Sequence, residues 1–199
     1  MTSNGIDVSN NNGKLNLVTG MAGLDFVIAK CTEGSDYVDL TYNWYQTQAL
    51  QIEGLHFGAY HFFHAENCDA VAEAQWFVRH AALKSGMSVW LDYETYGLRP
   101  EIDLAQIALF TATVKAITPV KRVGLYANLT GYARLGRQGL QDVCDPFWLA
   151  YPTGLTETPD TPLGQYGLSW TNHQYEVFNG IDRDYSRVTA SQLTKQFSW

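Results

Sequence analysis

Apolar residues recur along the chain in two alternating patterns. Short runs rich in β-branched and aromatic residues are separated by longer stretches of helical periodicity, and this alternation is typical of βα units around a mainly parallel sheet. Six runs predict strands, at residues 5–9, 25–31, 56–63, 87–94, 122–128 and 146–152. Most of these runs are continuously apolar, which is expected of strands that are buried on both faces. The pattern therefore predicts an α/β fold.

Three stretches between the strands predict amphipathic helices, at residues 41–53, 69–84 and 102–117. In the second stretch, Val71, Ala74, Val78 and Ala81 recur at the spacing of one helical face. Gly54 ends the first stretch, and Pro100 and Asp103 suit the first turn of the third.

The pattern changes after about residue 150. Residues 153–164 are rich in turn formers, and residues 164–170 and 173–178 predict two antiparallel strands joined through Thr171 and Asn172. A barrel built from the preceding units would therefore close with hairpin strands instead of helices.

Composition limits the classes of protein and partner. A chain of 199 residues suits a single domain spanning residues 1–199. The net charge of −7 argues against a nucleic-acid partner, because phosphate backbones require a basic surface. No apolar stretch approaches about 18 residues, so we expect no membrane insertion. The three cysteines are widely spaced without a CxxC pair, which indicates neither a disulfide scaffold nor a zinc ribbon.

Acidic residues gather where several predicted strands end. The stretch VWLDYET (89–95) places Asp92 and Glu94 at alternate positions, so both side chains face one side of the strand, about 7 Å apart. In parallel β/α barrels, active sites lie at the carboxyl ends of the strands, where the loops converge. Further acids at such positions are Asp7, Glu33, Asp182 and Asp184, the last two after the last predicted strand. We expect several of them to converge on one mouth.

Crowded carboxyl groups suit glycosidic cleavage. One member of such a group acquires a raised pKa and can donate a proton, while its neighbours stay charged. A glycosidase needs this pairing of a protonated acid with a carboxylate at the anomeric centre. A lone D-x-E is a weak signal, because exposed strands often carry acids. Here the preceding Val89, Trp90 and Leu91 are too apolar for an exposed strand, which favours a site.

Seven motifs together resemble the glycoside hydrolase family 25 lysozymes, the muramidases of fungi, streptomycetes and many phage endolysins. The motifs follow the order of that family and span nearly the whole chain: GIDVS (5–9), DFVIAKCTEG (25–34), GAYHFF (58–63), VWLDYE (89–94), LYAN (125–128), FWLAYP (147–152) and GIDRDYS (180–186). The resemblance implies a flattened, irregular, TIM-like β/α barrel closed by antiparallel C-terminal strands. It also implies hydrolysis of the β-1,4 bond between N-acetylmuramic acid and N-acetylglucosamine in bacterial peptidoglycan, without a metal or organic cofactor.

The resemblance also assigns roles to individual residues. Glu94 matches the general acid, and Asp92 matches the carboxylate that assists at the anomeric centre, directly or through the acetamido group of the substrate. Asp7 and Asp184 match the two remaining acids of the active site. The positions that match cleft aromatics, whose faces suit sugar rings, are Tyr60, Tyr126 and Trp148.

Three positions depart from the family pattern. Cys31 stands where the family usually has Ala, a small change for packing. The last motif reads D-Y-S (184–186) where D-x-N is common, so Asp182 is the alternative to Asp184. Residues 10–14 (NNNGK) lack the usual Gln before the glycine, which leaves the role of the first loop open.

Other polar residues have both a functional and an ordinary interpretation. Glu33 is a substrate contact or a solvated loop acid, and Asn128 and Gln174 bind sugar hydroxyls or serve as turn residues. Imidazole and thiolate groups that could bind zinc fall within thirteen residues, at His56, His61, His64 and Cys68. A regular strand would direct His56 and His61 to opposite faces, so we expect no zinc site there and a hydrogen-bonded role for His61.

Two other functions compete with the muramidase hypothesis. A chitinase-like glycosidase would usually carry a D-x-x-D-x-D-x-E strand motif, whereas Trp90 and Met87 occupy the two corresponding positions before Asp92. A catalytically inactive wall-binding module would be expected to lose Glu94 or Asp92, and both are present.

The biological setting is an expectation drawn from the same residues. The N-terminal stretch MTSNGIDVSNNNGK shows no basic region followed by an apolar run, as a secretory signal peptide would. We therefore expect a phage endolysin domain, monomeric, that stays in the host cytoplasm until a holin pore releases it to the cell wall.

Overall fold

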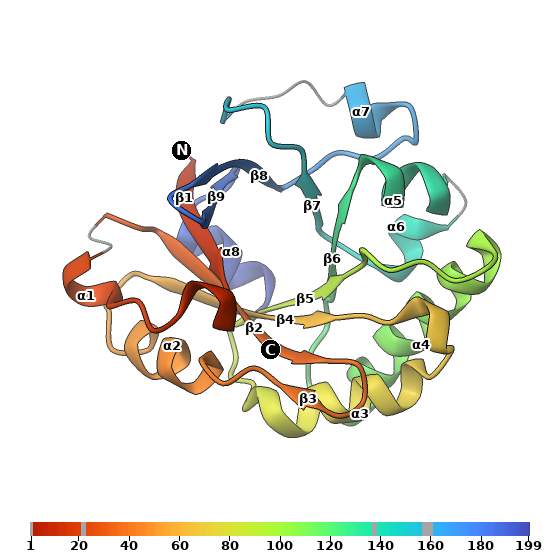
Figure 1. Cartoon of the computed structure of the whole chain (residues 1–199), viewed down its shortest axis with the longest axis horizontal. Helices are drawn as coiled ribbons and strands as arrows, with labels where there is room; N and C mark the ends of the chain where they lie inside the picture. The colour runs from red at the N-terminus through yellow and green to blue at the C-terminus, as the bar shows by residue number, and fades with distance from the viewer. Residues whose placement is uncertain (1, 21–22, 137–138, 157–160) are drawn as a thin grey trace.

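A closed barrel organises the computed structural model, which describes residues 2–20, 23–136, 139–156 and 161–199. Eight strands hydrogen-bond in the order β1-β2-β4-β5-β6-β7-β8-β9 and back to β1 (Figure 1). They are β1 (Ser3–Val8), β2 (Phe26–Glu33), β4 (His56–Phe62), β5 (Ser88–Asp92), β6 (Gly124–Asn128), β7 (Phe147–Ala150), β8 (Asn172–Phe178) and β9 (Ile181–Ser186). The short strand β3 (Tyr37–Val38) pairs with the end of β2 as an extra strand.

The strands from β1 to β8 pair in parallel around the barrel, and β9 pairs antiparallel with both β8 and β1. This arrangement confirms the predicted α/β barrel with antiparallel closure. Because β9 runs in the opposite direction, its first residues lie at the end of the barrel where the parallel strands finish.

The predicted hairpin between residues 164–170 and 173–178 is wrong. The hairpin joins β8 to β9, and Phe178 pairs with Ile181 across Asn179 and Gly180. Both turn residues have positive φ, 52° and 74°, as the Asn-Gly type I′ turn of a two-residue hairpin requires. Asp182 and Asp184 therefore lie within a strand instead of after the last one.

Helices cover the outer side of much of the barrel. Figure 1 shows α2 (Tyr42–Ala49), α3 (Ala70–Ala81) and α4 (Pro100–Ile117) beside β2, β4 and β5, with α5 (Leu129–Leu135) and α6 (Leu140–Val143) beside β6 and β7. Shorter elements are α1 (Leu17–Gly20), α7 (Thr161–Gly164) and two 3-10 turns at Asn10–Asn12 and Ala65–Asn67. The three predicted helices are present, with ends shifted by at most four residues. No helix of the described ranges combines the length and apolarity that crossing a bilayer requires.

The buried face of α3 differs from the predicted face. Val71 is 37% exposed, whereas Phe77 is fully buried and Ala74 and Ala81 face the barrel as expected. The large aromatic side chain, not the β-branched one, sets which side of this helix packs against the sheet.

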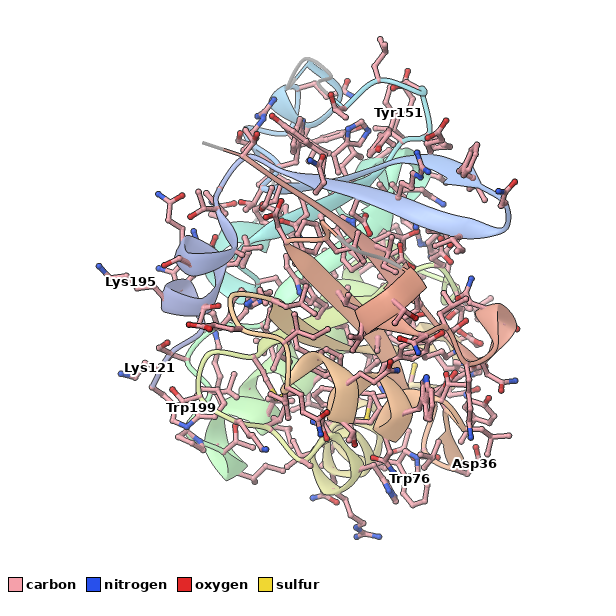
Figure 2. The ribbon with its side chains drawn as sticks, turned by 90° about the vertical axis from the view of Figure 1, so that its left-hand side faces the viewer. Asp36, Trp76, Lys121, Tyr151, Lys195 and Trp199 are labelled. Atoms are coloured by element: carbon pink, nitrogen blue, oxygen red, sulfur yellow. The ribbon has the colours of Figure 1, made fainter. Side chains whose placement is uncertain are left out.

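The barrel interior is a second apolar core. Side chains alternate along each strand, so Phe26 and Ile28 face inward and pack in a cluster with Trp90 and Trp148. The helix α8 (Ala190–Gln196) adds Leu193 to this cluster, and the following Phe197 joins it. In Figure 2, Lys121, Lys195 and Trp199 lie along one edge of the molecule, on the side of α8, while Asp36 lies on the opposite side.

Candidate active site

An open cleft of ≈ 190 Å³ lies at the carboxyl ends of the parallel strands. Its described lining combines acids with aromatic and amide side chains: Asp7, Ser9, Asn11, Asn12, Lys30, Tyr60, Phe62, Asp92, Glu94, Tyr126, Trp148, Gln174 and Asp182. Six of the residues to which the sequence assigned a site role thus line one cleft, together with the alternative acid Asp182 and the candidate amide Gln174.

Strand alternation directs the acids inward. Asp7 lies between the outward-facing Ile6 and Val8, and Asp92 follows Leu91 in the same way. On the reversed strand β9, Asp182 pairs in register with Asp7 near the mouth, and Asp184 pairs with Gln174 further down. The antiparallel closure therefore brings acids from the chain's two ends together.

A hydrogen-bonded chain connects the acids to the cleft wall. The Tyr126 hydroxyl donates to Oε1 of Gln174 at 3.0 Å, and Nε2 of Gln174 donates to Oδ2 of Asp7 at 2.8 Å. Gln174, one of two amides that the sequence offered as a candidate for sugar binding, thus fixes the orientation of Asp7.

Asp184 lies beneath the lining residues and is fully buried. Its Oδ1 accepts a hydrogen bond from the indole nitrogen of Trp148 at 2.9 Å. Trp148 is itself 2% exposed and packs edge-on against Tyr126 and Trp90, with ring centroids 4.7 and 5.4 Å apart. Trp148 therefore shapes the floor and holds an acid in place, whereas Tyr60 is partly exposed.

Burial and mutual repulsion raise the pKa values of the acids in this cluster. Desolvation is the main cause for each, and it raises the pKa of Asp7 to about 7, with repulsion by Asp182 in second place. The pKa of Asp92 rises well above its ordinary value, because Glu94 and Asp7 add to the desolvation. The pKa of Asp184 rises in the same way beside Asp7. Protonated and ionised carboxyl groups therefore coexist in the cleft near neutral pH.

Glu94 differs from its buried neighbours. The residue is exposed at the mouth, yet partial desolvation raises the pKa of its carboxyl group and repulsion by Asp182 adds to the rise, whereas the positive charge of Lys30 lowers it. Asp92 is only 6% exposed, and its Oδ1 has no hydrogen-bond partner within the described part of the chain. Glu94 and Asp92 thus supply the pair of carboxyl groups that most glycosidases use.

Lys30 is a cleft residue that the sequence reasoning missed. It is the single cation among the described lining residues, and its Nζ lies 2.5 Å from Oε2 of Glu33 and 4.7 Å from the centre of the Phe62 ring. The signal was present in the sequence, because Lys30 continues the inward-facing series of Phe26 and Ile28. An inward-facing lysine needs a polar cleft, because an apolar core cannot hold its charge.

Two predicted substrate contacts lie outside the described cleft lining. Glu33 ends β2 and bridges Lys30 and His64, with 3.1 Å between its Oε1 and Nε2 of His64. Asn128 caps α5 by accepting the Gly131 amide at 2.9 Å and also accepts the Tyr96 hydroxyl at 3.2 Å. Their observed partners are those of a supporting acid and of a helix cap.

The histidines considered for zinc have separate partners. His61 faces outward and bonds Thr32 at 2.8 Å and Glu73 at 2.9 Å, which agrees with its predicted hydrogen-bonded role. His56 lies at the other end of its strand, between the hydroxyls of Ser88 and Thr194, at 2.9 Å from each.

Comparisons with known proteins identify the family of this chain. The sequence profile described as Glycosyl hydrolases family 25 matches residues 6–181. An N,O-diacetylmuramidase of Chalaropsis sp is 31% identical over 124 residues, a match that spans 59% of this chain and 59% of that protein.

Two solved structures extend the likeness to almost the full chain. The lysozyme of Streptomyces coelicolor has 26% identity and a TM-score of 0.81, covering 96% of this chain and 95% of its own. The family GH25 lysozyme of Aspergillus fumigatus has 25% identity and a TM-score of 0.82, covering both chains completely. Because the family profile matches residues 6–181, most of the sequence, this chain belongs to glycosyl hydrolases family 25.

Proposed function

We propose that this protein is a muramidase, a lysozyme that hydrolyses the β-1,4 bond between N-acetylmuramic acid and N-acetylglucosamine in bacterial peptidoglycan. The observation that carries the proposal is the pair of Glu94 and Asp92 in one open cleft, with a raised pKa on each. Membership of family 25 and the muramidase and lysozyme names of its relatives support the choice of substrate.

Glu94 is the general acid of the proposed reaction. Its exposed position at the mouth lets it reach the leaving glycosidic oxygen, and the upward shift of its pKa favours the protonated form that a general acid needs. Asp92, deeper in the cleft, acts on the anomeric centre as a nucleophile or orients the 2-acetamido group of the substrate. As a nucleophile, Asp92 must be ionised while Glu94 holds the proton, although burial in the free protein favours the protonated form of Asp92.

The remaining acids and aromatics support these two. Gln174 holds Asp7, and the Trp148 indole holds Asp184, so fixed groups set the orientation of both carboxyl groups beneath the sugar. The accessible part of Tyr60 borders the cleft, where an aromatic surface suits the apolar C–H side of a sugar ring.

Replacing the proposed acid tests the function directly. Glu94→Gln should lower the rate of peptidoglycan cleavage by a factor of about 10² to 10⁴, because the amide cannot protonate the leaving oxygen. The measurement is mass spectrometry of fragments released from purified peptidoglycan by the wild type and the variant, with unfolding temperatures recorded for both. Glu53→Gln, at an exposed acid outside the described cleft lining, is the matched control.

The released fragments decide between the competing functions. Fragments ending in reducing N-acetylmuramic acid support the muramidase, and ends in N-acetylglucosamine would contradict the bond assignment. Binding to the wall without any release would favour the inactive binding module. NMR of the first-formed product separates retention of the anomeric configuration, expected for either role of Asp92, from inversion, which needs a base and a water molecule.

Delivery to the wall and oligomeric state stay predictions from the sequence. Expression in a bacterial host with and without a holin tests delivery to the wall, because only cells that produce both proteins should lyse. Light scattering of the purified protein tests whether it is monomeric in solution.

A further inference from the structure

The segment from Tyr93 to Gly97 carries Glu94 away from β5. The backbone N–H of Tyr93 continues the sheet by donating to the carbonyl of Tyr126 at 2.9 Å. Two residues later, the Thr95 hydroxyl donates to the carbonyl of Phe63 at 2.7 Å. These bonds tie the segment to β6 and to the residue that follows β4, but leave its outer side to be held by other groups.

Asp103 of α4 holds that outer side. Its carboxylate is fully buried and accepts the Tyr93 hydroxyl at 2.6 Å, the Gly97 amide at 3.1 Å and Nε of Arg134 at 2.8 Å. Arg134, on α5, also donates to the carbonyl of Gly97. One carboxylate and one guanidinium therefore fasten both ends of a five-residue segment.

Tyr93 and Gly97, the two residues that Asp103 bonds, lie before and after Glu94 in the chain. Tyr93 alternates with Asp92 and Glu94, so its ring is buried outside the barrel and packs on Tyr96 with centroids 5.0 Å apart, while the two acids face the cleft. The bonds on the outside therefore fix the backbone from which Glu94 projects into the cleft.

The fit at Gly97 is tight. A Cβ placed on Gly97 would lie 2.4 Å from Oδ1 of Asp103 and 3.3 Å from the carbonyl of Ala65. The backbone of the segment can therefore reach the Asp103 carboxylate only because residue 97 has no side chain.

We propose that Asp103, together with Arg134, is a positioning residue for Glu94, holding the segment from Tyr93 to Gly97 so that the acid points into the cleft. The inference rests on the proposed muramidase function. Charge-assisted bonds are short and directional, and a buried ion pair is a weak source of net stability. Here the Asp103–Arg134 ion pair serves to fix geometry, because active-site groups must be held within about 0.5 Å of their productive positions.

The test is Asp103→Asn, assayed with soluble glycan oligomers of alternating N-acetylglucosamine and N-acetylmuramic acid, well below the unfolding temperature. The amide cannot accept all three bonds and loses the charge pair with Arg134. We expect kcat to fall about 10- to 100-fold, the range in which a displacement of about 1 Å acts, with KM nearly unchanged. The ¹³C resonance of the Glu94 carboxyl should titrate at a different pH from the wild type.

A matched control separates positioning from stability. Gln46 of α2 is also buried and donates to the carbonyl of Ala81 at 3.1 Å, away from the described cleft residues. Gln46→Met should lower the unfolding temperature but leave kcat and the Glu94 titration at their wild-type values.

Two milder variants keep the inference testable if Asp103→Asn does not fold. Tyr93→Phe removes a single bond to Asp103, and Gly97→Ala pushes against it; each should lower kcat several-fold with little change in KM. Wild-type kcat and an unshifted Glu94 titration in all the variants that fold would overturn the inference. Inactivity of the wild type itself on every wall and glycan would instead refute the proposed function.

Discussion

Lys30 illustrates how a single side chain adjusts the whole acid cluster. It lies in the cleft beside Glu33, and its positive charge lowers the pKa values of both Asp92 and Glu94 against the larger effect of desolvation. The cluster therefore titrates in a range set by burial and moderated by one cation.

Removing this cation should move the pH dependence of the reaction. In Lys30→Met, the pKa values of Asp92 and Glu94 both rise, so both limbs of the profile of kcat/KM should shift to higher pH. Lys14→Met is the control, since Lys14 is exposed and lies over the Trp44 ring at 5.5 Å. A profile that coincides with the wild type would show that Lys30 does not act on these acids.

At the scale of the strands, the barrel is filled by matching large residues with glycines. A Cβ on Gly124 of β6 would lie 2.3 Å from the Trp90 ring on β5, and one on Gly5 of β1 would lie 2.4 Å from the Phe26 ring on β2. Each bulky interior side chain thus occupies the space that a neighbouring strand leaves free. Trp90 in turn packs on Trp148, which bonds Asp184, so this packing supports the site.

Filling one of these spaces should destabilise the protein. Gly124→Ala forces a methyl group against the Trp90 ring and should cost about 1–3 kcal/mol, the usual range for overpacking a core. Gly20→Ala is the matched control, because no atom of the described residues lies within 4 Å of the place that its Cβ would take, and a change of less than about 0.5 kcal/mol is expected. Chemical denaturation measures both, and equal stabilities would contradict the packing argument.

At the scale of the whole molecule, the acid cluster opposes folding as the pH rises. An acid whose folded pKa lies above its unfolded pKa binds more protons in the native state, so stability falls between the two values. For Asp7 this window runs from 3.8 to about 7, and the raised pKa values of Asp92 and Asp184 act in the same direction.

The unfolding temperature should therefore be higher at pH 5 than at pH 7.5. Asp7→Asn removes one buried charge and should flatten this dependence and raise the unfolding temperature at pH 7.5, while cleavage slows. Asp36→Asn, at an exposed acid on the surface (Figure 2), should keep the wild-type dependence. A wild-type unfolding temperature that increases from pH 5 to pH 7.5 would refute the raised pKa values of these buried acids.

The sequence by itself determined the local elements and the chemistry of the acids. Strand and helix patterns report local conformation and burial, so six strands, three helices and the inward-facing pair of Asp92 and Glu94 could be predicted from them. The Asn-Gly pair at residues 179 and 180 also indicates the observed hairpin, whereas the run at residues 164–170 resembles a strand but does not form one.

Only the tertiary structure decided which distant residues meet. Gln174 holds Asp7 from 167 residues away. Asp103 of α4 and Arg134 of α5 bond each other, and Asp103 also bonds the segment that carries Glu94. Such contacts depend on strand register, on the reversed direction of β9 and on how helices pack outside the barrel. Periodicity along one element carries no information about these relations, because they arise between elements and are fixed only when the barrel closes.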